Sequence, residues 1–404
     1  MVRKARRVLT LLGPAFVAAV AYVDPGNFAA NFSAGAEYGY ALLWVLVVAN
    51  LMASLVQYLS AKVGLVTGMS LPEVIAKKLG RKSRIIYWIQ AELVAISTDL
   101  AEVIGGAIAL NILFGLPLLL GAVITGLVSL LLLIIYTRRG QKLFERIIVG
   151  LLFIIPLGFF AGLAIQPPDG VAMAAGLLPQ LRNGEMVLLA AAMLGATVMP
   201  HVVYLHSALS RDRHGKAEKL ELKKLLRATK IDVGLAMVLA GSVNISMLLL
   251  AASALRGQPG VDSLEGIFAA LGNQVSPIVG GLFGLSLLVS GFASTTVGAH
   301  AGAIIMDGML KRSIPLLVRR VITIIPAVVI VGFGIDPTQA LIISQVILSF
   351  GIPFALVPLL LVTSSRKIMG NQRNHWTIIA LLSAITAVIV VLNIALIWLT
   401  ITGS

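Results

Sequence analysis

The chain has 404 residues, of which 58% are hydrophobic and only 12% are charged, and its mean hydropathy is +0.99. Because a soluble domain carries about 25% charged residues, this composition predicts a helical membrane protein with several spans. The sequence contains no cysteine, which excludes disulfides, thiolate metal ligands and cysteine nucleophiles. The 39 glycines favour helices that pack closely through small residues over an outer-membrane barrel.

Eleven apolar segments are long enough to cross a bilayer as helices, each of which needs roughly 17 to 25 residues. They lie at 9–33, 41–66, 85–113, 118–136, 146–165, 186–209, 229–254, 275–308, 316–334, 338–362 and 376–400. The sequence therefore predicts an all-α polytopic membrane protein with eleven transmembrane helices.

The 31 Lys and Arg residues, which give the chain its net charge of +14, are divided unevenly between the loops. If the N-terminus is cytoplasmic, all of them except Arg182 and Arg256 fall in segments on the cytoplasmic side. The positive-inside rule therefore predicts a cytoplasmic N-terminus and an external C-terminus. The positive charge is then a topology signal, and no nucleic-acid partner is expected.

Residues 1–21 also resemble a secretory signal peptide, with a basic start, an apolar core and Ala19-Val20-Ala21 as the cleavage site. Cleavage would leave the charge pattern of the later spans unchanged, so topology does not exclude this alternative. We expect the segment to be retained as the first span, and the mass of the intact protein tests that expectation.

Spans one and six each contain a proline near the middle, in AYVDPGNFAANF and GATVMPHVVYLH. Aligning Pro25 with Pro200 places Asp24 opposite Met199, five spans away. Because the offset is odd, the two halves lie upside down relative to each other, and such matched interruptions indicate an inverted repeat with a midplane substrate site. The alternative is that each proline is merely tolerated in a transmembrane helix. The expected units are a single transporter domain, 1–404, containing five-helix repeats at 9–165 and 186–362 and an extra eleventh helix at 376–400.

Asp24 lies beside the interruption of the first span. An ionised side chain at the centre of a bilayer costs at least about 2.5–3.5 kcal/mol, so it needs a partner or a function. Next to freed backbone carbonyls, this carboxylate predicts a cation site. Asn27 adds an amide oxygen, Met199 a thioether, and Ala21 and Ala196 their carbonyls. A thioether suits manganese, ferrous iron, cobalt or cadmium better than magnesium or calcium, although methionine is also a common core residue.

Three further acidic residues lie in span three. Glu92 and Asp99 are seven residues apart and share a helix face, and Glu102 lies about 60° from Asp99 around the helix. Such a stripe supplies groups that can load and release protons in turn. The alternative is structural ion pairing, for which Arg319 and Arg320 are the possible partners, and both roles can coexist.

Two histidines follow the break in span six. His201 and His206 point in directions about 140° apart, so we do not expect them to chelate one metal. His201 is a candidate proton carrier or a hydrogen-bonded helix residue. Gln345 in span ten is expected to bond to another helix, and His300 has no assigned role. Because the sequence shows no hydrolase motif, P-loop or nucleotide-binding glycine pattern, we expect neither enzymatic activity nor a prosthetic group.

The residues from Asp24 to Asn27 (DPGN) and from Ala196 to His201 (ATVMPH) together resemble the motifs of the Nramp family, most closely its bacterial proton-coupled manganese transporters. The resemblance runs along nearly the whole chain, including WIQAELVAISTDLAE, STTVGAHAG and LIISQVILSFGIPFALVPLL. It implies an eleven-helix, inverted five-plus-five repeat of the LeuT/APC type, with discontinuous helices one and six, in the bacterial inner membrane.

The resemblance also implies roles for single residues. The residues that it assigns to the metal are Asp24, Asn27 and Met199, the carbonyls of Ala21 and Ala196, and Gln345 in the occluded state. Those assigned to proton passage are Asp24, Asp99 and Glu102, with His201, Glu92, Arg319 and Arg320 in support. The methionine favours the manganese and iron branch, because relatives specialised for magnesium or aluminium lack it. The local sequence around His300 departs from the family pattern.

The expected function is therefore secondary active uptake of manganese, and also of iron, cobalt or cadmium, by alternating access with proton symport. Metal and proton would compete for Asp24, since a ligating carboxylate must be deprotonated. The expected partners are the transported ions and the lipid bilayer, without an obligate protein partner. The alternatives are a sodium-coupled amino-acid symporter, which has no use for Met199, a metal-sensing receptor, and an intramembrane hydrolase, for which no paired catalytic groups are visible.

Overall fold

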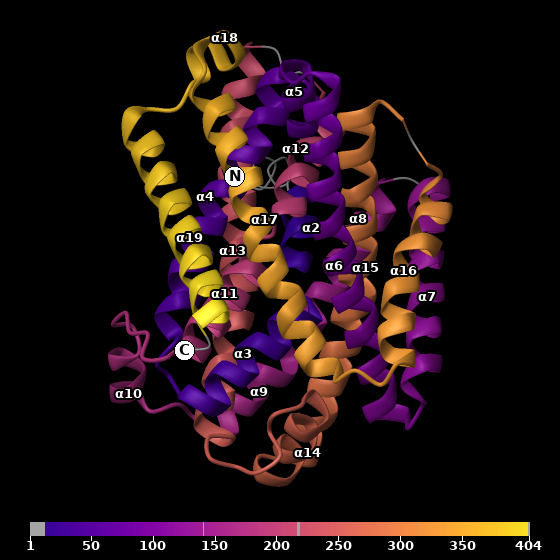
Figure 1. Cartoon of the computed structure of the whole chain (residues 1–404), viewed down its shortest axis with the longest axis vertical. Coiled ribbons are helices and arrows are strands. Elements are labelled where there is room, and N and C mark those ends of the chain that lie inside the picture. The colour runs from indigo at the N-terminus through magenta and orange to yellow at the C-terminus, as the bar shows by residue number, and fades with distance from the viewer. Residues whose placement is uncertain (1–12, 140, 216–218, 313, 403–404) are drawn as a thin grey trace, which may run out of the picture.

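The fold is helical throughout the part of the chain that the computed structural model describes, which is residues 13–139, 141–215, 219–312 and 314–402 (Figure 1). The helices are α2 (Pro14–Ala21), α3 (Pro25–Tyr38), α4 (Leu43–Thr67), α5 (Leu71–Lys78), α6 (Arg81–Phe114), α7 (Leu118–Arg139), α8 (Gln141–Ile154), α9 (Pro156–Ile165), α10 (Gly170–Ala175), α11 (Gly184–Thr197), α12 (Pro200–His214), α13 (Lys219–Ala254), α14 (Leu264–Gln274), α15 (Pro277–Leu310), α16 (Leu316–Gly332), α17 (Pro337–Ser364), α18 (Arg366–Met369), the 3₁₀ turn η1 (Gly370–Gln372) and α19 (Trp376–Thr402). The predicted all-α membrane fold is confirmed.

Nine segments of the described chain are long and apolar enough to cross a membrane. They do not include α2 and α3, which have 8 and 14 residues, or α16, which has 17. The predicted first span, 9–33, begins outside the described residues, so the total of eleven spans stays a prediction. Span five, predicted at 146–165, is one candidate membrane segment, Glu145–Ile165. A single turn residue, Ile155, separates α8 from α9 just before Pro156, whose nitrogen carries no hydrogen for a helical bond.

Two long helices, α6 and α15, pack along each other through the centre of the molecule. Around them α3 packs against α13, α11 against α17, and α4 against both α12 and α13. In Figure 1, α19 covers α17 on one side of the bundle, and α7 and α16 pack against each other at the opposite edge. The short halves α2, α3, α11 and α12 are therefore enclosed by longer, continuous helices.

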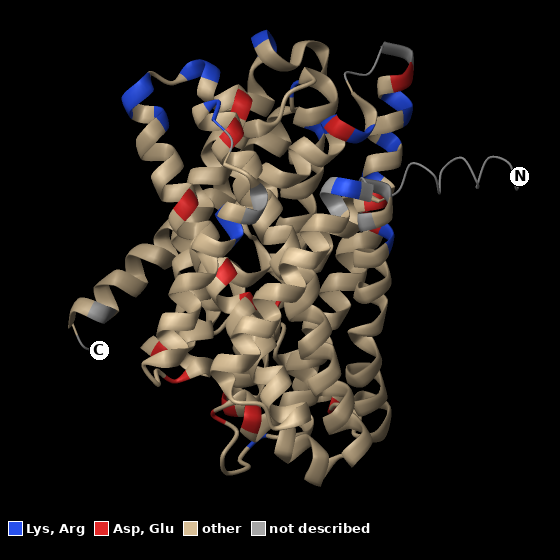
Figure 2. Ribbon diagram, turned by 90° about the vertical axis from the view of Figure 1, so that its right-hand side faces the viewer, with Lys and Arg blue, Asp and Glu red and all other residues tan. Residues whose placement is uncertain are grey.

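Basic residues gather at one end of the molecule (Figure 2). This end carries α5 and α18, whereas α10 and α14 lie at the opposite end (Figure 1). The sequence counted Arg319 and Arg320 with the loop at the basic end, but the structure places both side chains inside, at 3% and 0% exposure, in the first turns of α16. The remaining asymmetry has the form that the positive-inside rule requires, and the cytoplasmic location of this end stays a prediction.

The connecting helix α5 is docked on α12 at the basic end. The Ser70 hydroxyl caps α5 by accepting from the backbone N–H of Glu73, and the N–H of Leu71 donates to Ser207 Oγ over 2.8 Å. Arg211, near the end of α12, forms an ion pair with Glu73. Burial raises the pKa of Glu73, but the hydrogen bonds from Ser70 and the charge of Arg211 outweigh it and hold the pKa below its ordinary value of 4.5.

Candidate metal site

The break in the first span forms between Ala21 and Pro25. The chain tightens at the end of α2, where the N–H groups of Tyr22 and Val23 donate to the carbonyls three residues earlier, each over 3.1 Å. Asp24 then adopts an extended conformation and caps α3 by accepting a 2.8 Å hydrogen bond from the N–H of Asn27. The turn signature therefore starts a second helix inside the protein, with a carboxylate at its N-terminus.

Both candidate carbonyl ligands lie four residues before a proline. In an α-helix the carbonyl of residue i accepts from the N–H of residue i+4, and proline has no such hydrogen. Ala21 precedes Pro25 and Ala196 precedes Pro200 by that spacing, so neither carbonyl has a donor in its own helix. The two prolines therefore leave the carbonyls of Ala21 and Ala196 without their helical hydrogen bonds.

The other carbonyls of the first break are held by the surrounding helices. Asn244 of α13 donates over 2.7 Å to the carbonyl of Tyr22, and the hydroxyl of Ser290 in α15 donates to the carbonyl of Val23. Neither residue was predicted as part of the site. Polar residues in apolar helices are the signal that could have found them, although that signal names no partner.

Side chains from α3 and α17 and a backbone carbonyl from α11 meet at the two breaks. The amide nitrogen of Asn27 donates to Asp24 Oδ1 over 2.7 Å and to the carbonyl of Ala196 over 3.1 Å. The amide nitrogen of Gln345, on α17, lies 3.5 Å from Asp24 Oδ2. All four residues are fully buried. Within the described part of the chain, the amide oxygens of Asn27 and Gln345 have no hydrogen-bond partner, so two unused buried acceptors stand beside a carboxylate.

Met199 lies at the second break, immediately before α12, and is fully buried. The described residues contain no group of three or more acidic or histidine side chains placed to hold a metal. The candidate site instead combines one carboxylate with neutral oxygens and a thioether. The residues predicted for the metal thus lie in one region, around the interruptions of spans one and six.

Close packing fixes α17 beside this region. Gly195 of α11 faces the backbone of α17, and a Cβ atom at Gly195 would come within 2.0 Å of the carbonyl oxygen of Gln345. Only a glycine leaves room for the two backbones at this distance. The approach of α11 to α17 is what brings Gln345 to Asp24.

The acidic stripe on α6 is paired with α16. Arg319 forms an ion pair with Glu92, and Arg320 forms one with Asp99 over 2.9 Å. Arg320 is fully buried and also donates to the hydroxyl of Thr295. The expectation that these two arginines are the partners of the stripe is confirmed, and the structure adds which arginine serves which acid.

Glu102 differs from the other two acids. It is fully buried, and within the described chain it has no ion-pair partner within 4 Å. A Cβ atom at Gly298 of α15 would come within 2.9 Å of a Glu102 oxygen and 3.3 Å of an Asp99 oxygen. Glu102 and Asp99 therefore converge on one glycine, and Arg320 is the cation beside them.

The two histidines of α12 belong to separate contacts. Nδ1 of His201 lies 3.3 Å from the hydroxyl of Thr98 on α6, and Nδ1 of His206 lies 2.8 Å from the amide oxygen of Gln57 on α4. The structure bears out the expectation that they do not share one metal. Both are fully buried, and His300 on α15 is 7% exposed.

The sequence model of the family described as natural resistance-associated macrophage protein-like (Nramp) matches residues 15–399. The chain belongs to the Nramp family. This Nramp chain is 56% identical over 394 residues to the divalent metal cation transporter MntH of Mycobacterium tuberculosis, covering 97% of this chain and 92% of that protein. It is 47% identical over 399 residues to the MntH protein of Bacillus subtilis, covering 98% and 93%.

Solved structures show the same relationship. The Nramp chain superposes on the manganese transporter of Eremococcus coleocola, solved with an aromatic bis-isothiourea substituted compound, with a TM-score of 0.87 at 33% identity, covering 96% of this chain and 86% of that one. Mhp1, a nucleobase-cation-symport-1 family transporter, superposes with a TM-score of 0.58 at 15% identity, covering 96% and 91%, and MhsT with 0.63 at 13%, covering 95% and 98%. The last two share the fold alone, and the predicted LeuT-type fold is confirmed.

Proposed function

We propose that this protein takes up divalent transition-metal ions, manganese first and also iron, cobalt and cadmium, by alternating access coupled to proton symport. The observation that carries the proposal is the meeting of the Asp24 carboxylate, the Asn27 amide and the Ala196 carbonyl at two helix breaks in the protein interior. The similarity to divalent metal cation and manganese transporters supports the class of cargo.

The composition of the site supports transition metals over the more abundant dications. Magnesium and calcium prefer shells made of oxygen alone, whereas a thioether is a softer ligand. Met199 would supply that ligand, and the carbonyls of Ala21 and Ala196 would complete a shell around the side chains of Asp24 and Asn27. Gln345 would contribute its free amide oxygen when α17 closes over the ion.

The direction of transport follows from orientation. We place the N-terminus and the basic end on the cytoplasmic side of the bacterial inner membrane, and the C-terminus on the outer side. An inside-negative potential then favours entry by about 4.6 kcal/mol per 100 mV for a dication. Single cysteines at Lys78 and Asp262 test this orientation, because the chain has no other cysteine. An impermeant maleimide should label only the Asp262 variant in intact cells, and the reverse pattern would invert the model.

Proton coupling is proposed to begin at Asp24 as well. Metal binding requires this carboxylate to be deprotonated, and the displaced proton would pass inward along α6. Asp99 and Glu102 would carry it, with His201 beside the break and Glu92 at the far end of the stripe. Arg319 and Arg320 would pair with Glu92 and Asp99 along this path.

Radioactive manganese counterflow in proteoliposomes tests the proposal. The wild-type protein should exchange external for internal manganese, and Asp24→Ala should abolish exchange, because the only carboxylate of the site is gone. Asp169→Ala is the matched control, since Asp169 is an exposed acid that caps α10 and should leave exchange unchanged. Normal exchange by the Asp24 variant would refute the proposed site, and metal binding without exchange by the wild type would indicate a sensor.

A further inference from the structure

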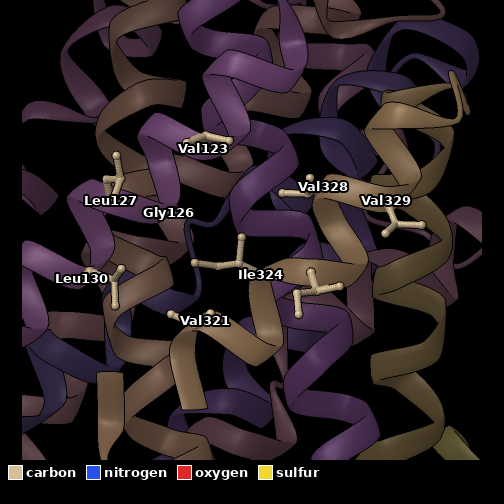
Figure 3. A pocket seen from close by; sticks show the side chains of 9 residues that line it. Val123, Gly126, Leu127, Leu130, Val321, Ile324, Val328 and Val329 are labelled. Carbon is tan, nitrogen blue, oxygen red and sulfur yellow. The ribbon is translucent and has the colours of Figure 1, made fainter. Parts of the chain in front are cut away.

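An apolar groove runs along the outer face of the molecule between α7 and α16 (Figure 3). Its walls are Val123, Leu127 and Leu130 from α7 and Ile324, Ile325 and Val328 from α16. Leu127 is 59% exposed and Ile325 is 54% exposed. The metal site and the acidic stripe lie elsewhere, so no part of the proposed function uses this groove.

The groove lies at the depth of the inner half of one leaflet. The apolar part of α7 ends at Ile135, and at 1.5 Å per helical residue Leu130 lies about 8 Å and Val123 about 18 Å from that edge. The hydrocarbon core is about 30 Å thick, so one leaflet occupies about 15 Å of it. The groove therefore begins within the leaflet at the basic end and reaches the midplane. The half of an acyl chain that carries its terminal methyl group lies at this depth.

Basic side chains stand at the same end of the two helices. Arg138 follows the apolar part of α7, and Lys311 and Arg312 precede α16, and all three are exposed. Because α7 and α16 are neighbours that run in opposite directions, the end of α7 and the start of α16 are at the same membrane surface. Basic residues between helices at the cytoplasmic surface are suited to an anionic headgroup.

We propose that the groove binds one anionic phospholipid, with an acyl chain between α7 and α16 and its phosphate at Arg138 and Arg312. An apolar slot at acyl-chain depth and cationic side chains at headgroup depth, on the same pair of helices, are the juxtaposition that such a lipid fits. A neutral lipid would fill the slot but would gain nothing from the charges.

The lipid would also support the ion pairs of the acidic stripe. The helix α16 carries Ile324 and Ile325 on the groove and Arg319 and Arg320 toward α6. It is an edge helix that packs on α7, α6 and α15. A chain wedged between α7 and α16 would hold α16 in the position in which both arginines reach their acids, so we expect the lipid to increase transport.

Native mass spectrometry of the full-length protein measures the binding directly. Protein released from nanodiscs of equal phosphatidylglycerol and phosphatidylcholine should retain one phosphatidylglycerol. Ile325→Trp, which fills the groove, and the double variant Arg138→Gln/Arg312→Gln should each lower that retained fraction, the charge variant by at least about tenfold. Ile322→Trp is the matched control, because Ile322 is 52% exposed on the same helix but does not line the groove.

Equal retention of both lipids, or unchanged retention in the Ile325 variant, would overturn the proposal. A stable dimer without bound lipid would also overturn it, because a second copy of the chain would then cover this face. Manganese uptake in vesicles with and without phosphatidylglycerol gives a second readout that rests on the proposed function. Uptake should rise several-fold with the anionic lipid in the wild type and not in the charge variant, while lipid retention stands independently of any transport.

Discussion

The side-chain amide of Asn27 donates a 3.1 Å hydrogen bond to the carbonyl of Ala196, 169 residues away. This bond joins the interruption of the first span to that of the sixth. The same amide group also donates to Asp24, so its nitrogen serves both breaks while its oxygen has no partner. In the proposed metal site this oxygen would bind the cation, so Asn27 would link ion binding to the relative position of the two broken helices.

Replacing Asn27 should therefore weaken metal binding without unfolding the protein. We expect Asn27→Ala to raise the dissociation constant for manganese by about 10–100-fold, the range found when a residue that hydrogen-bonds to a metal ligand is removed, because Asn27 donates to Asp24. Isothermal titration with the purified protein measures it. Asn374→Ala is the control, because Asn374 is a buried amide that bonds to Lys62 and Thr363 and to neither break. Equal losses in both variants would mean that Asn27 acts only through packing.

Met199 should determine which dications are excluded. Met199→Ala removes the soft ligand and leaves the oxygen ligands, so manganese uptake should persist while calcium or magnesium becomes a substrate. Uptake assays with each metal alone, and in competition with manganese, measure the change. Met193→Ala controls for loss of a buried methionine, since Met193 is equally buried on α11. A metal preference that is the same in all three proteins would contradict the role assigned to the thioether.

Removing one partner of the Asp99–Arg320 ion pair should destabilise the fold more than removing both. Arg320→Gln leaves a buried carboxylate without its cation, which typically costs about 3–5 kcal/mol of stability. The double variant Asp99→Asn/Arg320→Gln should recover most of that loss, because both charges are removed. Thermal unfolding in detergent compares the wild type, Asp99→Asn, Arg320→Gln and the double variant. If the double variant recovers stability but still lacks metal-dependent proton uptake, the pair has a transport role beyond structure.

The docking of α5 should weaken in acid. The pKa of Glu73 lies below its ordinary value of 4.5, so its charge stabilises the docked helix fully above that value. The stabilisation is lost as the pH falls through the lowered pKa. Because Glu73 and Arg211 are partly exposed, the contribution is at most about 1 kcal/mol.

Hydrogen exchange of residues 71–78, corrected for intrinsic rates, tests this contribution at pH 7 and pH 4. Glutamine can still complete the capping box, so Glu73→Gln removes the charge and keeps the cap. Exchange in this variant should be up to about fivefold faster at pH 7 and nearly independent of pH. A pH dependence equal to that of the wild type would assign the effect to another group.

Much of the fold and the centre of the candidate site could be predicted because they depend on residues close together in the sequence. The pattern of Asp24, Pro25 and Asn27 favours a helix start, and hydropathy locates most of the spans. Proline by itself was a weaker guide. Pro326 and Pro353 lie within continuous helices, and Pro156 lies inside the candidate span Glu145–Ile165, where one turn residue, Ile155, precedes it.

The remaining parts of the site depend on contacts between distant segments. Asn244 and Ser290 hold the unwound carbonyls of residues 22 and 23 from more than 200 residues away, and nothing in their own neighbourhoods distinguishes them from other polar residues in helices. Likewise, the positions of the charged residues in the sequence indicated Arg319 and Arg320 as partners for the stripe. Consecutive residues on a helix point in different directions, so the packing of α16 decides which acid each arginine contacts.

The glycine at position 195 sets the direction in which the molecule can move. Because the backbones of α11 and α17 already touch there, α17 has no free space to advance toward the broken helix at that level. We therefore expect α11 and α17 to move together, or α17 to move away from α11, when Asp24 becomes exposed. The contact thus limits how closely α17 can approach α11. A residue larger than glycine at position 195 should keep α17 away from Asp24, although it would contact neither the ion nor its ligands.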